Sequence, residues 1–181
     1  LKTHGIRDIV MIGAMKRPAL IQLWPDMRTV LFYLKVGFRA LGDDGFLKAL
    51  RHEFESEGLH VHGVHRFMPE LLAPEGLLTE TKPGEGDEAA IRLGIRESQR
   101  IGALDIGQSI IVLGDKILGV EGKRGTKALI QEYGGFGSIL VKTCKPQQDR
   151  DLDLPTIGPA TVAQCAAAGM AGIVIEAGAS I

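Results

Sequence analysis

The sequence is poor in aromatic residues and in cysteine. Aromatic residues make up 5% of its 181 positions, and its two cysteines, Cys144 and Cys165, lie far apart and form no CxxC pair. Such cysteine usage fits a reducing compartment better than a disulfide-stapled fold. We therefore expect a cytoplasmic protein in which both thiols are buried as small apolar side chains.

An excess of one charge and a long apolar run are also missing. The 22 acidic residues balance the 21 basic ones, which removes the global positive field on which non-specific nucleic-acid binding depends. The apolar runs, such as Ile9–Ile12 and Ile110–Leu113, are far shorter than the roughly 20 residues of a membrane-spanning helix. We predict no nucleic-acid partner and no transmembrane segment.

The glycine-rich fingerprints of nucleotide binding do not occur either. The chain contains neither GxGxxG nor GxxxxGK[ST], so its residues support neither a dinucleotide site nor a P-loop. Glycine itself is abundant, however, with 24 residues, nearly twice the usual share of about 7%. This abundance predicts many tight turns and close backbone approaches.

The first residues of the sequence have the pattern of the end of a helix. The chain starts at Leu1 without a methionine, and its first residues have the pattern of a helix end with Gly5 in the capping position. We expect the sequence to be a fragment that is preceded by further chain.

Apolar spacing in the first third of the chain predicts a strand, two helices and a second strand. The expected elements are a strand at Asp8–Met15, a helix at Met27–Leu41, a helix from Asp43 or Asp44 to Gly58, and a strand at Leu59–Val64. This order is typical of the later part of a doubly wound α/β unit. We therefore predict a partial Rossmann-like domain over residues 1–74.

A second α/β domain is predicted after a linker at residues 75–86, where proline and glycine are frequent. This domain spans residues 87–181, and its strands are expected to form a mixed sheet. The expected elements are helices at Asp87–Gly102, Thr126–Tyr133 and Pro159–Ala168, and strands at Ser109–Leu113, Ile117–Glu121, Ser138–Thr143 and Gly172–Ile175.

The densest polar stretch lies between a predicted strand and a predicted helix, where α/β folds place their sites. If residues 149–154 are extended, alternation sends Asp149, Asp151 and Asp153 to one side of the chain. Mg²⁺ is usually bound through one or two carboxylates together with phosphate oxygens. The stretch therefore predicts a magnesium site.

Basic residues accompany this stretch in the sequence. Between Lys116 and Arg150, seven basic residues stand against three acidic ones, a net charge of +4. A locally basic region attracts phosphate, which favours an anionic substrate. Each single lysine could instead belong to an ordinary solvated face.

Three further polar residues have two interpretations each. Asp43 and Asp44 could cap the helix that they precede, or one of them could face a ligand. Gln108 could donate to a phosphate or a base edge, or it could satisfy a turn. The sequence leaves both alternatives open.

Three histidines, His60, His62 and His65, lie close together in the sequence. A zinc site would need a further carboxylate or cysteine, and we expect none beside these histidines. We interpret these residues as surface histidines that flank a strand.

Several ordered motifs give the chain a resemblance to a known family. They are GDDG at Gly42–Gly45, PELLAPEG at Pro69–Gly76, GALDIGQ at Gly102–Gln108 and DRDLDLPTIG at Asp149–Gly158, together with KRP at Lys16–Pro18 and EAG at Glu176–Gly178. With these motifs, the chain resembles the LpxI family, the UDP-2,3-diacylglucosamine pyrophosphatases of lipid A biosynthesis in Gram-negative bacteria. The likeness covers nearly the whole chain.

The resemblance implies a Mg²⁺-dependent hydrolase whose substrate is a lipid-linked UDP-sugar. Water attack at the α-phosphorus would release UMP and 2,3-diacylglucosamine 1-phosphate. The resemblance also implies two domains with substrate between them, and a cytoplasmic protein in peripheral contact with the inner membrane. The alternative is a non-catalytic module that binds lipid or a nucleotide sugar.

The resemblance further implies roles for particular residues. Asp149 matches the family's essential aspartate, so we expect it to ligate the metal, with Asp153, or to orient the attacking water. The residues expected to bind substrate are Lys145 and Arg150 on the diphosphate, with Gln108, Asp43, Asp44 and Thr126.

One segment departs from the family pattern. Where the family usually reads VEAIEGTD, residues 120–127 read VEGKRGTK, so that Arg124 and Lys127 replace two acidic residues. Reversed charge near a metal opposes cation binding, and this departure is what keeps the non-catalytic alternative open.

Overall fold

The computed structural model describes residues 4–13, 27, 30–31 and 43–181. Contacts divide the chain into two units, residues 1–69 with 149–153, and residues 70–148 with 154–181. Two sheets are formed, one of two strands and one of four. The predicted α/β class with a mixed sheet is confirmed.

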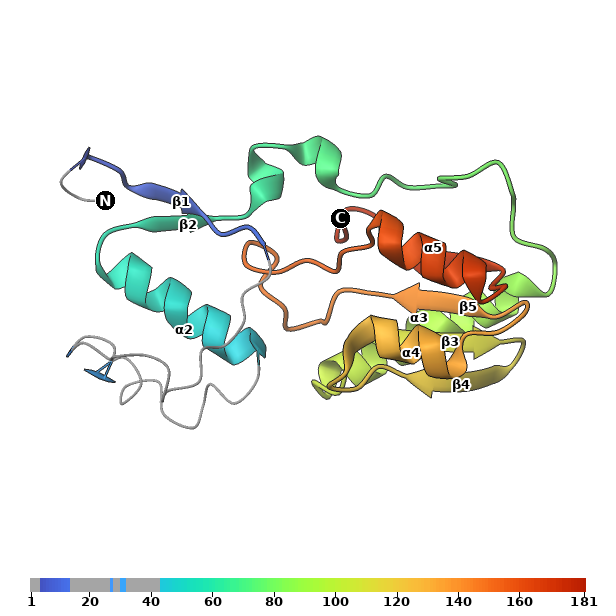
Figure 1. Ribbon diagram of the computed structural model, residues 1–181. Coiled ribbons are helices and arrows are strands. Elements are labelled where there is room, and N and C mark those ends of the chain that lie inside the picture. Colours follow the sequence, from blue (N-terminus) through green and yellow to red (C-terminus); the bar gives the residue numbers. More distant parts are fainter. Residues whose placement is uncertain (1–3, 14–26, 28–29, 32–42) are drawn as a thin grey trace. The chain divides into compact units, whose positions relative to one another are not determined.

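The first unit contains a parallel strand pair and a helix that connects them. Strand β1 (Asp8–Val10) pairs with β2 (His60–His62), with Asp8 opposite His60. Parallel strands need a crossover connection, and helix α2 (Asp43–Ser56) lies in it (Figure 1). The helix predicted at Met27–Leu41 lies largely outside the described residues.

Two short 3-10 helices follow β2. The first, η3 (Val64–Arg66), begins after Gly63, and the second, η4 (Pro69–Leu71), covers the start of the proline-rich segment. The expected loop therefore contains single helical turns.

The four-stranded sheet of the second unit has the order β4-β3-β5-β6. Its strands are β3 (Ser109–Leu113), β4 (Lys116–Val120), β5 (Ile139–Lys142) and β6 (Gly172–Ile175). Strand β3 is antiparallel to both β4 and β5, whereas β5 and β6 are parallel. The predicted hairpin is present, and Gly114 supplies its left-handed residue at φ +57°.

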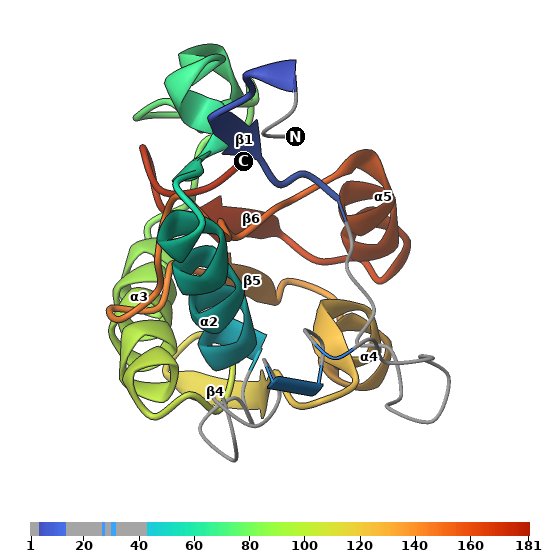
Figure 2. The ribbon, with the colours of Figure 1, turned by 90° about the vertical axis from the view of Figure 1, so that its left-hand side faces the viewer.

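Helices cover both faces of this sheet. Helix α3 (Asp87–Ala103) lies on one face, and α4 (Gly125–Tyr133) and α5 (Pro159–Ala167) lie on the other (Figures 1 and 2). Alternation along β3 explains the two cores, because Ile110 and Val112 face α3 whereas Ile111 faces α4 and α5. Both cysteines are buried, as predicted.

One glycine sets how closely α3 approaches the sheet. A Cβ atom on Gly94 would lie 3.1 Å from Val141 Cβ and closer still to one of its methyl groups. The abundance of glycine therefore serves close packing here as well as turns.

The stretch predicted to be extended from Asp149 begins as a turn instead, so this prediction is wrong. The backbone N–H groups of Leu152 and Asp153 donate to the Asp149 carbonyl oxygen at 3.0 and 3.1 Å. The Asp149 carboxylate also accepts a hydrogen bond from the Asp151 N–H at 3.1 Å. Aspartate side chains often close turns in this way, and strand alternation does not apply.

Among the helices that the structure describes, none combines the length and the apolar character that crossing a bilayer requires.

Candidate functional site

The 149–153 turn belongs to the first unit and is held there by charge. Arg51 Nη1 donates to Asp149 Oδ2 at 2.7 Å, and Arg51 Nε donates to Glu55 Oε1 at 2.8 Å. The hydrogen bond to Glu55, followed by that to Asp149, raises the pKa of Arg51 against the opposing effect of burial. One guanidinium thus connects α2 to the turn.

The second carboxylate of the turn has four neighbours. Asp151 Oδ1 accepts from the Gly63 N–H at 3.2 Å and lies 3.4 Å from Arg66 Nε and 3.7 Å from His65 Nε2. Asp151 Oδ2 lies 3.7 Å from Arg51 Nη1. Asp151 is therefore surrounded by positive and hydrogen-bonding groups, which fasten the turn to the end of β2.

The other site residues predicted for this unit lie in the same turn or at the start of α2. Arg150 and Asp153 are exposed, and Asp153 shares the turn with Asp149 through its backbone. Asp43 and Asp44 form the start of α2, as the capping interpretation requires of the helix boundary. Their side chains lie outside the described part of the structure.

The aspartates of the turn supply hard oxygen ligands of the kind that Mg²⁺ prefers. Within the described ranges, however, no group of three or more histidine, cysteine, aspartate or glutamate side chains is arranged to hold a metal ion. A magnesium ion at Asp149 would therefore complete its shell with water and phosphate oxygens, which is the usual manner of Mg²⁺ binding. The oxygen donors of the turn fit Mg²⁺ when water and phosphate oxygens complete its coordination shell.

Two of the three histidines near β2, His62 and His65, contact an aspartate. His62 Nε2 lies 2.7 Å from Asp8 Oδ1, and the His62 ring meets Phe67 edge-on. The hydrogen bond from His62 lowers the pKa of the Asp8 carboxyl. His65 contacts Asp151, and its buried Nδ1 has no hydrogen-bond partner among the described residues.

The second unit contains a buried polar network at the junction of its sheet and α4. We call Glu121, Thr126 and Lys142 the Glu121–Lys142 network; Glu121 is 8% exposed and Lys142 is 7% exposed. The Thr126 hydroxyl donates to Glu121 Oε1 at 2.5 Å and accepts from Lys142 Nζ at 3.3 Å. Lys142 Nζ also donates to the Thr156 carbonyl oxygen at 3.3 Å.

Gln108, a predicted substrate-binding residue, is held by this network through its backbone. Its N–H donates to Glu121 Oε2 at 3.1 Å, and its carbonyl oxygen accepts from Ser98 Oγ at 2.9 Å. The side-chain Oε1 is buried and has no partner within the described chain. A buried acceptor of this kind normally meets a water or a ligand.

Lys145, predicted to bind the diphosphate, pairs with a carboxylate of its own unit. Lys145 Nζ lies 2.6 Å from Asp105 Oδ1. Asp105 has φ +56°, a left-handed conformation in which aspartate is tolerated better than most residues. The GALDIGQ motif thus brings a carboxylate to Lys145.

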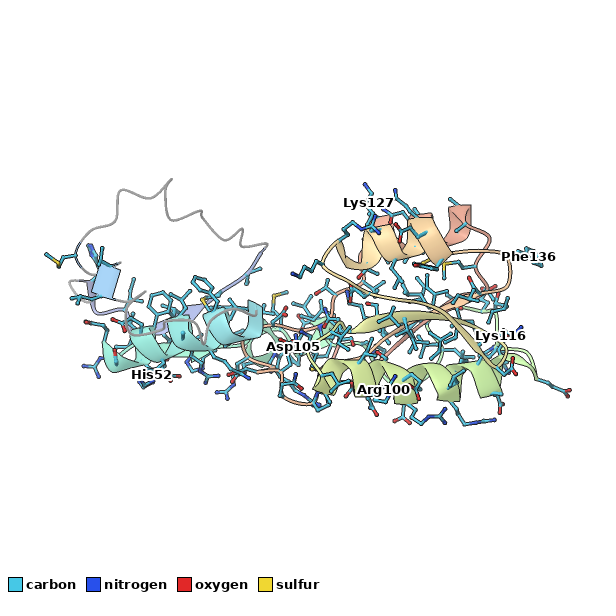
Figure 3. All side chains as sticks on the ribbon, turned by 90° about the horizontal axis from the view of Figure 1, so that it is seen from below. His52, Arg100, Asp105, Lys116, Lys127 and Phe136 are labelled. Carbon is cyan, nitrogen blue, oxygen red and sulfur yellow. The ribbon has the colours of Figure 1, made fainter. Side chains whose placement is uncertain are left out.

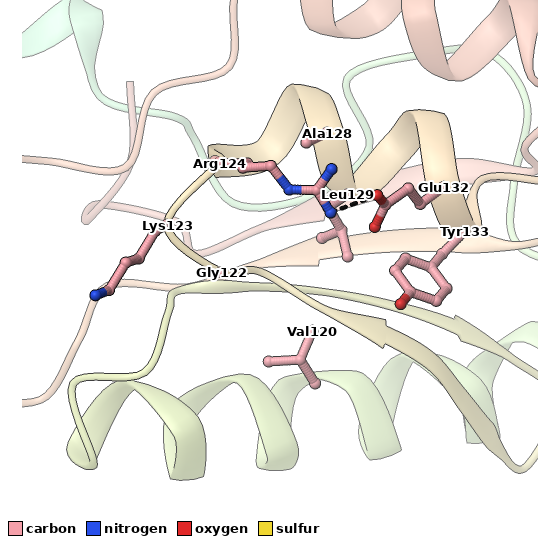
Figure 4. A pocket seen from close by; sticks show the side chains of 9 residues that line it. Val120, Gly122, Lys123, Arg124, Ala128, Leu129, Glu132 and Tyr133 are labelled. Atoms are coloured by element: carbon pink, nitrogen blue, oxygen red, sulfur yellow. Dashed lines mark hydrogen bonds and ion pairs between the residues drawn. The ribbon is translucent and has the colours of Figure 1, made fainter.

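A pocket of about 260 Å³ opens between the end of β4 and α4. Figure 4 shows Arg124 and Glu132 joined by an ion pair at this pocket, with Tyr133 beside Glu132. The reversed charge at Arg124 therefore has an acidic partner. Lys127 is exposed and projects from α4, as Arg100 does from α3 (Figure 3).

Sequence reasoning missed Arg51 and the link that the Thr126 hydroxyl makes between Glu121 and Lys142. Arg51 lies 98 residues before Asp149, and nothing in the helical pattern of α2 distinguishes it from a solvated arginine. Lys142 did carry a signal, because it continues the apolar run Ile139–Val141 within the predicted strand Ser138–Thr143, and a lysine on a buried strand needs partners.

Comparisons with known proteins match both units. A family model described as the LpxI N-terminal domain matches residues 1–71, and one described as the LpxI C-terminal domain matches residues 74–181. The chain is 37% identical over 191 residues to the UDP-2,3-diacylglucosamine pyrophosphatase LpxI of Caulobacter vibrioides. The match covers 98% of this chain and 68% of that protein.

Proposed function

Because the chain belongs to the LpxI family, we propose that it hydrolyses the diphosphate of UDP-2,3-diacylglucosamine in lipid A biosynthesis. The observation that carries this proposal is the 37% identity to a relative of that name along 98% of the chain. The products are UMP and 2,3-diacylglucosamine 1-phosphate.

The reaction is a displacement at the α-phosphorus. A water oxygen forms the new bond to this phosphorus, and the bond to the bridging oxygen breaks. The bridging oxygen leaves with the β-phosphate on the sugar lipid, and the water proton passes to a base. Such a displacement needs an oriented water and neutralised charge on the phosphate oxygens.

Asp149 is the residue that we assign to the chemistry. Its carboxylate is held in one orientation by Arg51 and by the Asp151 N–H, and the side chain keeps 22% of its surface exposed. A fixed but accessible carboxylate can orient a water or share a cation. This combination supports Asp149 over the exposed Asp153, to which we assign a secondary role in metal binding.

Mg²⁺ is the proposed metal. When bound, it would supply charge neutralisation at the diphosphate, and Asp149 and Asp153 would hold it together with phosphate oxygens. The support for this proposal is the oxygen-only donor set of the turn, which suits magnesium better than zinc.

Positive and polar side chains are assigned to the substrate. Lys145 and Arg150 bind the diphosphate, and the buried Gln108 acceptor meets a donor group of the substrate. Asp43, Asp44 and Thr126 are also assigned to substrate binding. Because the Thr126 hydroxyl is hydrogen-bonded to Glu121 and Lys142, its contribution to substrate binding is indirect.

The remaining proposals concern the protein as a whole. The first unit has a Rossmann-like fold, a proposal supported by the parallel β1–β2 pair and its helical connection. A lipid-linked substrate further supports a cytoplasmic enzyme in peripheral contact with the inner membrane.

The test is product analysis with the full chain and UDP-2,3-diacylglucosamine in H₂¹⁸O, with Mg²⁺ and with EDTA. We expect UMP that carries ¹⁸O, and loss of turnover with EDTA that added Mg²⁺ restores. Label in the sugar phosphate would contradict attack at the α-phosphorus. Substrate binding without UMP release would support the non-catalytic module.

A further inference from the structure

Asp149 is oriented by two donors that differ in kind. Arg51 Nη1 reaches Oδ2 at 2.7 Å, and the Asp151 N–H reaches Oδ1 at 3.1 Å. A carboxylate offers about four acceptor positions, and donors on both oxygens fix the plane of the group. The orientation of Asp149 therefore depends on Arg51 and on the position of the turn.

Arg51 itself is oriented by α2. Its Nε donates to Glu55 one helical turn later, at 2.8 Å, while its Nη1 contacts Asp149. A guanidinium presents these donors in a rigid fork, whereas a lysine ammonium is a single point charge. Arginine is thus the side chain that can bind both carboxylates at once.

The turn can reach Arg51 only because residue 63 has no side chain. A Cβ atom on Gly63 would lie 2.9 Å from the Asp151 Cα atom, which is backbone and cannot rotate away. Gly63 has an ordinary φ of −70°, so its requirement for glycine is steric. Its N–H also donates to Asp151 Oδ1 at 3.2 Å.

We propose that Arg51, Gly63 and Asp151 form a clamp that positions Asp149, with Arg51 as the positioning residue that contacts it directly. This inference rests on the proposed function, in which Asp149 acts at the diphosphate. Arg51 orients the carboxylate, Asp151 ties the turn to the end of β2, and Gly63 leaves room for the turn to approach.

The test compares UMP release by the full chain and by the variants Arg51→Ala, Arg51→Lys and Gly63→Ala. We expect kcat to fall about a hundredfold in Arg51→Ala, since small misplacements of a reacting group cost this much, while KM stays within a few-fold. Arg51→Lys should retain part of the rate. Gly63→Ala should lower kcat without any change of charge.

Chemical rescue separates positioning from stability. Added guanidinium at millimolar concentration should raise the rate of Arg51→Ala and leave the wild-type rate unchanged, an effect that a merely structural role would not give. Arg92→Ala is the matched control, because Arg92 also pairs with a glutamate one turn away, at 3.2 Å, on an exposed helix face. Its rate should equal that of the wild type.

The outcomes separate this inference from the proposed function. Wild-type kcat in Arg51→Ala and Gly63→Ala, with Asp149→Ala inactive, would overturn the clamp and leave the function standing. A wild-type chain that releases no UMP would overturn both. If Arg51→Ala fails to fold, Arg51→Lys and Gly63→Ala decide, and a full rate in both contradicts the proposal.

Discussion

The two polar clusters of this protein differ in how far water reaches them. In the first unit, the side chains of Arg51, Asp149 and Asp151 keep between 17% and 25% of their surface exposed. In the second unit, Glu121 and Lys142 are buried, with 8% and 7% of the whole-residue surface exposed. Partly exposed ion pairs add little stability, whereas a buried network is costly to break.

This difference in exposure indicates that the two clusters have different roles. A carboxylate that water can reach is available to a substrate, and its partly exposed ion pair contributes little to stability. The Glu121–Lys142 network instead joins β5, α4 and the backbone of Gln108. We infer that the first cluster serves turnover and the second serves the fold.

Lys142→Met should have the largest effect on stability. It removes the cation from the network around the buried Glu121 carboxylate, and we expect the free energy of unfolding to fall by about 3 kcal/mol. Urea denaturation measures this free energy of unfolding. The control Lys116→Met, at an exposed position, should change the free energy by less than about 0.5 kcal/mol. Equal stability of the two variants would refute the architectural role.

Thr126→Val should have the next largest effect. The substitution keeps the shape but removes the hydroxyl that joins Glu121 to Lys142, at a cost of about 1–2 kcal/mol for buried groups left without a partner. Thr126→Ser keeps the hydroxyl and should retain most of that stability. If both variants denature at the same urea concentration, the hydroxyl has no such role.

Arg51→Met should change stability less than either. Its pair with Asp149 is partly exposed, so we expect a loss of less than about 1 kcal/mol beside the large loss of kcat expected for Arg51 variants. A loss as large as that of Lys142→Met would erase the distinction between the two clusters.

The smallest expected effect is a pH dependence at Asp8, the first residue of β1. The hydrogen bond from His62 holds the pKa of Asp8 below its ordinary value of 3.8. Because the pKa of Asp8 is lower in the folded state, the stability that Asp8 contributes is fully present above pH 3.8. It is lost as the pH falls through the folded-state pKa. An NMR titration should find the Asp8 midpoint below 3.8.

The control for this titration is a second carboxylate with other partners. His62→Ala should return the Asp8 midpoint to its ordinary value. It should leave Glu97 unchanged, since hydrogen bonds from Arg100 and Arg96 lower the pKa of that group. An unchanged Asp8 midpoint in His62→Ala would show that His62 is not the cause.

The sequence predicted the elements of the second unit closely, because their apolar periodicity reflects real burial. The strands Ser109–Leu113 and Gly172–Ile175 have the predicted bounds, and the helix from Asp87 ends one residue later than expected. Local pattern suffices where one face of an element is buried.

The turn at Asp149 shows where local pattern fails. Alternating aspartates and leucines read as an extended strand, but hydrogen bonds from backbone N–H groups to Asp149 form a turn. Asp149 itself was found through its motif, whereas Arg51 was not, since only tertiary folding brings residues 98 positions apart together. A motif identifies a reactive group more readily than the groups that orient it.

The most direct test of the assignment of catalysis to the 149–153 turn is the initial rate of UMP release by Asp149→Ala. It is measured beside the wild type with Mg²⁺ and UDP-2,3-diacylglucosamine. We expect the rate to fall by about a hundredfold or more, with a loss of less than about 1 kcal/mol in the free energy of unfolding. An Asp149→Ala enzyme that releases UMP at the wild-type rate would contradict the assignment of catalysis to this turn.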